Sequence, residues 1–200
     1  MITLWSFLEK GGILTWPILL CSVLGVAIFL DRLFVLRKLE RQGALRAVPD
    51  KILPPEGLSS LARGEGVLAL MAREIAPVCC KDRALLESIL RHVIDRQLAM
   101  ASRYLELLAT LASVAPLLGL LGTVVGLIKA FMVVERVGGK VDAAMLAGGI
   151  WEAMITTAAG LSVAIPLIVG HRYLVSRLES YEESLEVLAM RLIKALFSER

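Results

Sequence analysis

The chain contains three stretches with almost no charged residues, each long enough to cross a lipid bilayer. They run over residues 11–30, 107–128 and 143–170. About 20 apolar residues, rising 1.5 Å per residue in a helix, span the roughly 30 Å hydrocarbon core of a membrane. The sequence therefore predicts an all-α integral membrane protein with three transmembrane helices.

The composition supports this fold class. Of the 200 residues, 57% are hydrophobic but only 6% are aromatic, so the apolar excess lies in aliphatic side chains. Ordinary globular chains are about 45–50% apolar even when glycine is included. Disorder, a collagen-like repeat and a disulfide scaffold are excluded by the same composition. The formal net charge of +3 is too small to indicate a nucleic-acid-binding protein.

The basic residues predict the orientation of the spans. Lys and Arg number 13 in residues 31–106 and 5 in residues 171–200, but only 4 in residues 1–10 and 129–142 together. Because basic residues accumulate on the cytoplasmic side, we expect the loop 31–106 and the tail 171–200 to be cytoplasmic. The N-terminus and the short loop 129–142 are then expected on the outer side.

The first span is expected to remain in the mature protein. Its apolar run exceeds the 7 to 15 residues of a signal-peptide core, and Arg32, Arg37 and Lys38 follow it closely, as they would after a stop-transfer anchor. Residues 1–10 form an amphipathic segment that is expected to lie at the outer surface of the bilayer.

Both cytoplasmic regions are predicted to contain helices that continue the spans. One apolar stripe leads into the second span without a breaker, so a single helix is expected to project from the membrane. A second stripe follows the third span. We interpret both stripes as intramolecular packing faces, and the joining of subunits into a ring is the alternative. Residues 42–66 are rich in Pro and Gly and predict a loop with short helical pieces. The stripes comprise Leu86, Leu90, Val93, Gln97, Met100, Tyr104 and Leu107, and then Leu174, Leu178, Tyr181, Leu185, Leu188 and Leu192.

The sequence contains no recognisable catalytic or metal-binding pattern. Cys21 lies inside the first span, and Cys79 and Cys80 have no His at a ligand spacing. His92 and His171 stand alone. The sequence also lacks a phosphate loop and a nucleophile elbow. We therefore expect no enzymatic activity, no metal and no cofactor.

Small residues repeat at helical spacing along one face of the second span and one face of the third. Such faces allow membrane helices to approach closely where no hydrophobic force drives their association. Prolines lie in the same spans, where a neighbour or water must satisfy any carbonyl that they free. The expected packing residues are Pro116, Gly119, Gly122 and Gly126 in the second span, and Ala153, Gly160, Ala164 and Pro166 in the third.

Three threonines in these spans are candidate residues of a polar pathway. Thr123 lies among the glycines of the second span, and Thr156 and Thr157 lie in the third. A hydroxyl group can bond within its own helix or face a hydrated path. The sequence leaves both roles open for each threonine.

Glu152 is the only charged residue inside the third span. If this helix begins near Ala143, the carboxyl group lies about 13 Å into the span. An acid at that depth costs about 2.5 kcal/mol or more and is kept mainly where it faces a bundle interior or a water-filled cavity. A later helix start would place Glu152 at the outer interface instead. The uncharged run before it favours the buried position.

These segments resemble the MotA/TolQ/ExbB proton channel family, and within it the ExbB/TolQ branch. The resemblance rests on Ala115–Gly126 with Ala130 and Phe131 in the second span, and on Gly149–Met154 and Thr156–Pro166 in the third. Around the first span it rests on Gly11, Gly12, Trp16–Leu19, Ser22 and Asp31–Leu33. It covers nearly the whole chain except residues 42–81, whose role it leaves open. The MotA branch fits less well because it is longer and has four spans. The choice between ExbB and TolQ stays open.

The resemblance implies a homopentamer of three-span subunits in the bacterial cytoplasmic membrane. Such a ring surrounds the single-span helices of two ExbD- or TolR-type partners, whose membrane aspartate accepts protons. Thr123, Glu152, Thr156 and Thr157 are then expected to line the proton pathway. Proton flow, worth about 2.3 kcal/mol per charge per 100 mV, would drive work on a periplasmic effector of TonB or TolA type. Sodium in place of the proton stays open, because both ions use carboxylates and hydroxyls.

Two other classes of membrane protein are alternatives to a proton channel subunit. In the first, the chain is a non-conducting membrane scaffold, in which the small-residue faces assemble a bundle and Glu152 makes a static contact. In the second, it is a solute carrier, which is disfavoured because three spans contain no internal repeat of the kind that transporters use.

Overall fold

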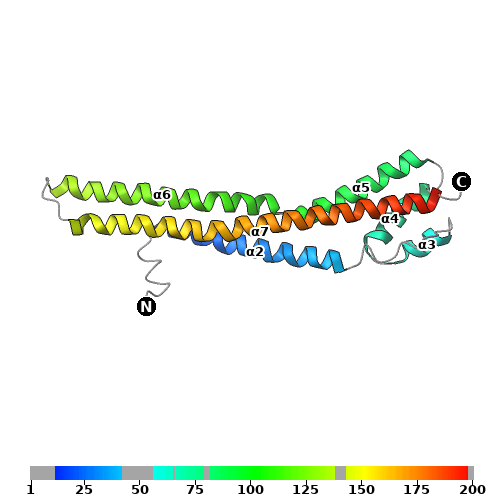
Figure 1. The fold of residues 1–200 in the computed structure, drawn as a ribbon, viewed down its shortest axis with the longest axis horizontal. Coiled ribbons are helices and arrows are strands. Elements are labelled where there is room, and N and C mark those ends of the chain that lie inside the picture. The colour runs from blue at the N-terminus through cyan, green and yellow to red at the C-terminus, as the bar shows by residue number, and fades with distance from the viewer. Residues whose placement is uncertain (1–11, 42–55, 65, 79–81, 138–142, 198–200) are drawn as a thin grey trace. The chain divides into compact units, whose positions relative to one another are not determined.

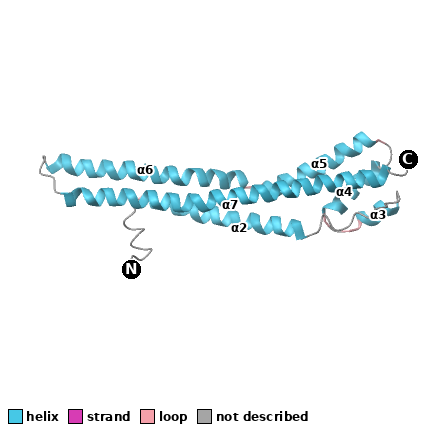
Figure 2. Ribbon diagram, viewed as in Figure 1, coloured by secondary structure: helices cyan, strands magenta, loops and turns pink. Residues whose placement is uncertain are grey.

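A computed structural model describes residues 12–41, 56–64, 66–78, 82–137 and 143–197. The regular structure of these residues is helical (Figures 1 and 2). Three of the helices are long and apolar enough to cross a membrane. The predicted fold class is therefore confirmed. In chain order the helices are α2 (Thr15–Arg41), α3 (Glu56–Ala62), α4 (Val67–Ile75), a 3₁₀ turn at Ala76–Val78, α5 (Arg83–Ser102), α6 (Leu105–Val137) and α7 (Ala143–Phe197).

The chain divides into two units. The first unit consists of the described residues up to Leu30 together with Tyr104–Tyr173, and the second consists of those in Asp31–Arg103 and Leu174–Arg200. The first unit therefore contains most of the three apolar stretches, and the second contains most of the charged residues. Each unit is described separately below.

In the first unit, α7 packs against both α2 and α6 (Figure 1). Glycines mark each contact. A Cβ on Gly25 of α2 would lie 2.6 Å from the side chain of Leu167, and one on Gly170 would lie 2.9 Å from the ring of Phe29. Side chains on the outer faces are exposed, among them Leu117 at 62%. A large exposed apolar surface of this kind fits contact with lipid or with other membrane helices.

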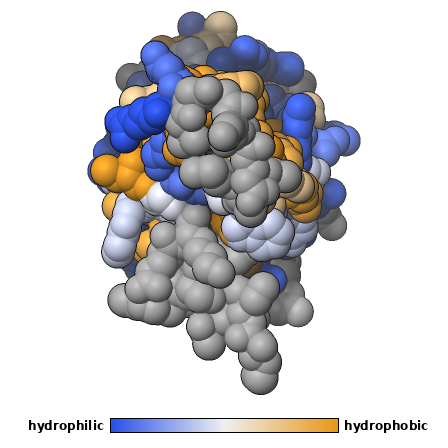
Figure 3. Space-filling view, turned by 90° about the vertical axis from the view of Figure 1, so that its left-hand side faces the viewer, coloured by the Kyte–Doolittle hydropathy of each residue, from blue (hydrophilic) through white to orange (hydrophobic). Residues whose placement is uncertain are grey.

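The C-terminal end of α6 carries polar residues again. Glu135 and Arg136 are exposed in the last turns of α6. Figure 3 views the molecule from this side, and both hydrophilic and hydrophobic side chains are visible around the residues drawn in grey. The helix α6 therefore continues past Lys129, the residue that ends its uncharged run.

The second unit has a core of large aliphatic side chains from α4, α5 and α7. Met71 and Ile75 of α4 pack with Leu86 and Leu90 of α5, all at most 1% exposed. The C-terminal part of α7 completes the core with Tyr181, Leu185, Leu188 and Leu192. The predicted packing face of the tail is confirmed: Leu174 is also buried, and Leu178 is half-buried.

The predicted continuous helix before the second span is wrong. Arg103 leaves the helical region with ψ 133°, and Tyr104 has φ +67°, so α5 ends at Ser102 and α6 begins at Leu105. A left-handed residue breaks the helical hydrogen-bond ladder and rotates the face that follows it.

Around the break the buried face differs from the predicted stripe by one residue. Ala101, Leu105 and Leu108 are buried, whereas the predicted stripe members Met100, Tyr104 and Leu107 are 52%, 43% and 47% exposed. The apolar pattern does not reveal the break, because apolar residues continue on both sides of it.

A buried arginine of α2 lies close to this break. Arg32, only 8% exposed, donates from Nη1 to the carbonyl oxygen of Met100 at 3.1 Å. Its guanidinium also pairs with Asp31 at 2.6 Å. The last carbonyls of a helix have no partner within the helix. Arg32 therefore satisfies one of the open carbonyl groups at the C-terminus of α5.

Some expectations concern residues outside the described part of the chain. These are the amphipathic segment 1–10, the adjacent Cys79 and Cys80, and most of the loop 42–66, of which the structure describes α3 and the turn after it. Cys21 is described as a buried free thiol in α2.

Candidate functional site

The backbones of α6 and α7 approach each other closely along one line, which we call the seam. The seam is formed by the small-residue faces of both helices. A Cβ on Gly160 would lie 2.7 Å from the carbonyl oxygen of Ala115, and one on Gly119 would lie 3.1 Å from Cα of Thr157. Since a real Cβ almost never lies within 3.0 Å of such atoms, Gly160 requires the absence of a side chain.

The other expected packing residues lie along the same helices. Gly126 faces Ala153, Gly122 faces Thr156, and Ala164 is 2% exposed. Both helices continue through their prolines. Pro116 is half-buried, whereas Pro166 is exposed. Gly149, which the sequence pattern did not single out, also belongs to the seam, because a Cβ there would lie 2.9 Å from that of Ala130.

The three threonine hydroxyls all donate to backbone carbonyls. Thr157 Oγ1 crosses the seam to the carbonyl oxygen of Gly119 at 2.8 Å. Thr156, only 1% exposed, donates to the carbonyl oxygen of Glu152 at 2.8 Å. Thr123 donates to Leu120 within its own helix at 2.6 Å. The structure therefore places Thr156 and Thr157 in the seam and directs the hydroxyl of Thr123 to its own helix.

Glu152 forms an ion pair across the seam. Its Oε1 accepts from Nζ of Lys129 at 2.6 Å, which joins α7 to α6. The Glu152 side chain is 26% exposed and that of Lys129 is 50% exposed, so the acid is the more buried partner. Because α7 begins at Ala143, Glu152 lies well inside the helix and not at its start.

The turn before α2 approaches the same carboxylate. Gly12 has φ +69°, a left-handed conformation that favours glycine, and its carbonyl accepts from the backbone N–H of Thr15. A Cβ on Gly12 would overlap Oε1 of Glu152. Three segments of the chain therefore meet at this oxygen: the turn at Gly12, α6 through Lys129, and α7 itself.

Lys129 and Gly12 were not predicted as site residues. A signal for Lys129 was present in the sequence: it is the nearest base after the second uncharged stretch, and Glu152 is the lone acid of the third. Charged residues in membrane helices usually pair with one another. Gly12 is among the residues that carry the family resemblance, but no signal pointed to its contact with Glu152, because that contact depends on a turn that meets a residue 140 positions later.

The part of the chain that the structure describes contains no group of three or more metal-ligating side chains. His92 is exposed and His171 is half-buried. The polar groups of the seam are thus one carboxylate, one ammonium and hydroxyls. Such groups can hold or pass a proton, and they do not form a nucleophile with a base.

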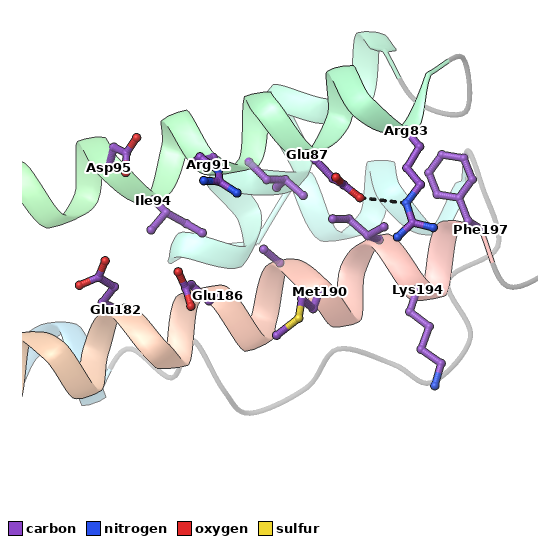
Figure 4. A pocket seen from close by; sticks show the side chains of 13 residues that line it. Arg83, Glu87, Arg91, Ile94, Asp95, Glu182, Glu186, Met190, Lys194 and Phe197 are labelled. Atoms are coloured by element: carbon purple, nitrogen blue, oxygen red, sulfur yellow. Dashed lines mark hydrogen bonds and ion pairs between the residues drawn. The ribbon is translucent and has the colours of Figure 1, made fainter.

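A pocket of about 910 Å³ lies in the second unit, between α5 and α7 (Figure 4). Figure 4 shows Arg83, with its partner Glu87, toward one end, and Asp95 with Glu182 toward the other. Its lining also includes apolar side chains such as Ile94. This pocket was not predicted, because it arises where two helices diverge and no motif marks it.

The fold and the seam define a class of protein before any comparison is made. Three long apolar helices, two of them joined through glycines around an ion-paired carboxylate, define a multi-pass membrane protein with a polar element between its helices.

The chain belongs to the MotA/TolQ/ExbB proton channel family, whose model matches residues 62–187. The matched range includes all of α6 and the seam. The predicted resemblance is therefore confirmed. Proteins of this family are transport channel subunits, so the expectation that the chain is not an enzyme is also confirmed.

Named relatives agree with this assignment. The biopolymer transport protein exbB1 of Vibrio cholerae is 33% identical over 187 residues, covering 87% of this chain and 80% of its own. An ExbB homolog of Methanothermobacter thermautotrophicus is 28% identical over 192 residues, covering 93% of this chain and 68% of its own. The Tol-Pal system protein TolQ of Haemophilus influenzae is 40% identical over 91 residues, covering 45% of this chain and 39% of its own.

Proposed function

We propose that this chain is the ring-forming subunit of a proton-driven motor in the bacterial cytoplasmic membrane. Its partners are single-span subunits of ExbD or TolR type, each with a membrane aspartate, and a periplasmic effector of TonB or TolA type. The ring is a homopentamer, with the N-terminus in the periplasm and the C-terminus in the cytoplasm. Family membership and the basic residues of the loop 31–106 and the tail support this proposal.

One observation carries the proposal: a single carboxylate is kept in the seam of a membrane protein. Glu152 lies inside an otherwise uncharged span, ion-paired with Lys129 and next to the buried Thr156. A carboxylate in a membrane helix is costly and is retained mainly on ion paths, in proton relays or as a counter-ion. Glu152 is therefore the group that we assign to proton passage.

In the proposed mechanism the ring presents polar groups to the partner's aspartate. Glu152, Thr123, Thr156 and Thr157 line this path, and the small-residue seam holds their helices in register. A carboxyl group that meets water on one side and an apolar wall on the other must gain and lose a proton as it moves. The free energy of that cycle is then available for work on the effector.

Two observations favour alternative functions. The TolQ of Haemophilus influenzae has the highest of the identities given above, although over less than half of the chain, which favours a TolQ-like role in envelope maintenance. The three threonine hydroxyls all donate to backbone carbonyls, which favours a non-conducting scaffold in which these groups only hold helices together.

Purification together with a single-span partner of ExbD or TolR type tests the assembly. The protein is isolated in mild detergent, and its native mass is measured. We expect five copies of this chain and two of the partner. A monomer, or a ring without the partner, would contradict the proposed motor.

Two substitutions test the pathway residues. Glu152→Ala and Thr157→Val are expected to abolish energised work while the complex still assembles. Glu135→Gln and Ser162→Ala are matched controls, since both side chains are exposed on the same two helices. Full activity in both test variants would contradict the assigned pathway. Assembly without any dependence on the proton gradient would favour the scaffold.

A further inference from the structure

The geometry points to Lys129 as a positioning residue for Glu152. We propose that the Lys129 ammonium is the resting counter-ion of the Glu152 carboxylate, and that Glu152 enters ion passage only after Lys129 has released it. This inference rests on the proposed function. It adds a residue that controls when the Glu152 carboxylate can take part in ion passage.

The contact is direct and it crosses the seam. Lys129 Nζ lies 2.6 Å from Glu152 Oε1, the length of a charge-assisted hydrogen bond. The two residues are 23 positions apart and lie on different helices, so the bond exists only while α6 and α7 keep their register. While the bond exists, one of the lone pairs of the carboxylate is occupied by an N–H of Lys129.

The same oxygen is enclosed from a second side by Gly12. Because a Cβ on Gly12 would overlap Oε1, the backbone of this turn lies against the carboxylate. The Thr156 hydroxyl donates to the carbonyl group of Glu152 and so leaves the carboxylate to Lys129. Lys129 therefore holds an oxygen that the surrounding backbone already shields.

The described helices of the first unit contain few other charges that could face this carboxylate. Glu152 is the only charged residue of α7 before His171, and α2 contains none before Asp31. On α6, the charged residues nearest to Lys129 are Glu106 on one side and Glu135 on the other. From the described helices of the first unit, Lys129 is thus the charge positioned to control Glu152.

Lys129 is suited to release its partner. Its side chain is half exposed, whereas that of Glu152 is 26% exposed. An ammonium on a flexible four-carbon stem is strongly hydrated and can reach toward water, while the shorter acid stays in place. Lys129 is therefore the more exposed member of the pair, and Glu152 is the more enclosed one.

The ion pair itself is tested first, independently of any activity. The full chain in membranes is treated with a water-soluble carbodiimide, which joins an ammonium and a carboxylate in contact through an amide bond with loss of water. Mass spectrometry of the digest is expected to show the peptides of Lys129 and Glu152 joined. Arg136→Gln should leave this product unchanged, whereas its absence from the unaltered chain would overturn the proposal.

The role of the pair is tested by passive proton leak. The complex with its single-span partner is placed in vesicles with a pH gradient and no effector. Lys129→Gln is expected to raise the leak at least about threefold, the scale on which a coupling residue acts. Lys129→Arg keeps the positive charge and is expected to restore the low leak. Arg136→Gln, which removes a positive charge two turns further along α6, is the matched control.

A double variant shows whether Lys129 acts through Glu152. In Lys129→Gln combined with Glu152→Gln, the leak is expected to fall back to the level of the unaltered complex or below it. A purely structural role predicts instead that Lys129→Gln weakens assembly and that the second change does not repair it. An unchanged leak in Lys129→Gln, or a leak that persists in the double variant, would overturn the role of Lys129.

These outcomes are separate from a failure of the proposed function. If Glu152→Ala retains energised work, the pathway assignment fails and the role of Lys129 fails with it. If Glu152→Ala loses work while Lys129→Gln leaks no more than the unaltered complex, only the inference about Lys129 fails.

Discussion

The two units hold α7 by opposite means. In the first unit, its contacts with α6 are made mainly by glycine, alanine and threonine, so that backbone approaches backbone, as at Gly160 and Ala115. In the second unit, the same helix packs through Leu185, Leu188 and Leu192, which are at most 2% exposed. One continuous helix therefore uses small residues in one half and large aliphatic residues in the other.

The difference follows from the solvent around each half. In water, burying a leucine removes apolar surface from the solvent, so large side chains stabilise the second unit. In lipid, moving a leucine from the acyl chains into a helix contact releases little free energy. Close backbone packing and interhelical hydrogen bonds stabilise the helix contacts there instead. The same substitution should therefore have different effects in the two units, and the following predictions run from the largest effect to the smallest.

Truncation of a core leucine should have the largest effect. Leu185→Ala is expected to destabilise the second unit by about 2–5 kcal/mol, because it opens a cavity at a side chain with no exposed surface. Denaturant or thermal unfolding of the purified protein measures the change. Leu117→Ala, on an exposed side chain of the first unit, is the control and should change stability little. Equal losses in both variants would contradict the comparison.

Addition of one methyl group in the seam should have the next largest effect. Gly160→Ala places a Cβ 2.7 Å from the carbonyl oxygen of Ala115 and is expected to cost about 1–3 kcal/mol, as overpacking does. Thermal stability in mild detergent measures the change. Gly148→Ala is the control, because a Cβ there has nothing within 4 Å. A neutral Gly160→Ala would show that the seam is looser than the structure describes.

Loss of the hydroxyl bond across the seam should have a smaller effect on stability. Thr157→Val removes the hydrogen bond to Gly119 and is expected to cost about 0.6 kcal/mol, the average for such bonds in membranes. Thr123→Val is the control, because that hydroxyl bonds within α6. The same assay in detergent compares the two variants. A larger loss in Thr123→Val would argue against the seam as the source of the difference.

The smallest effect at neutral pH is expected for Tyr181→Phe in the core of the second unit. The Tyr181 hydroxyl is buried without a hydrogen-bond partner among the described residues, and desolvation by this burial raises the pKa of Tyr181 above its ordinary value of 10.0. Removing an unsatisfied hydroxyl leaves a core of nearly the same shape. We therefore expect Tyr181→Phe to be neutral or slightly stabilising.

The pH dependence of Tyr181→Phe has a definite sign. Because the folded state holds the proton more tightly, ionisation favours the unfolded chain as the pH rises above 10.0. In the unaltered protein, the contribution of Tyr181 to stability is fully present below that pH and is lost as the pH rises through the raised pKa. Tyr181→Phe should lose less stability over this range, which unfolding at a series of pH values measures. Parallel curves of stability against pH for the two proteins would contradict the raised pKa of Tyr181.

Most of the fold was predictable because it depends on composition and period. The three spans follow from runs without charge, and the packing face of the tail follows from apolar residues every three or four positions. The break at Arg103–Tyr104 was not predictable in this way. It depends on one residue adopting a left-handed conformation, and no glycine or proline announces it.

The candidate site was predictable only in part. The small-residue faces and Glu152 stand out in the sequence, since small residues and a lone acid are rare patterns in a membrane span. The partner of Glu152 did not stand out, although Lys129 is the first base after the second uncharged stretch. Its pairing depends on which turn of α6 faces which turn of α7.

The sequence by itself determined that three helices meet lipid, that two of them carry a face of small residues, and that a single acid lies within the otherwise uncharged third span. These properties follow from the free energy of transferring each residue between water and lipid, and from the 3.6-residue period of the helix. The tertiary structure alone decided that Glu152 meets Lys129 beneath the turn at Gly12. That contact joins three distant segments, and only the register between packed helices brings them together.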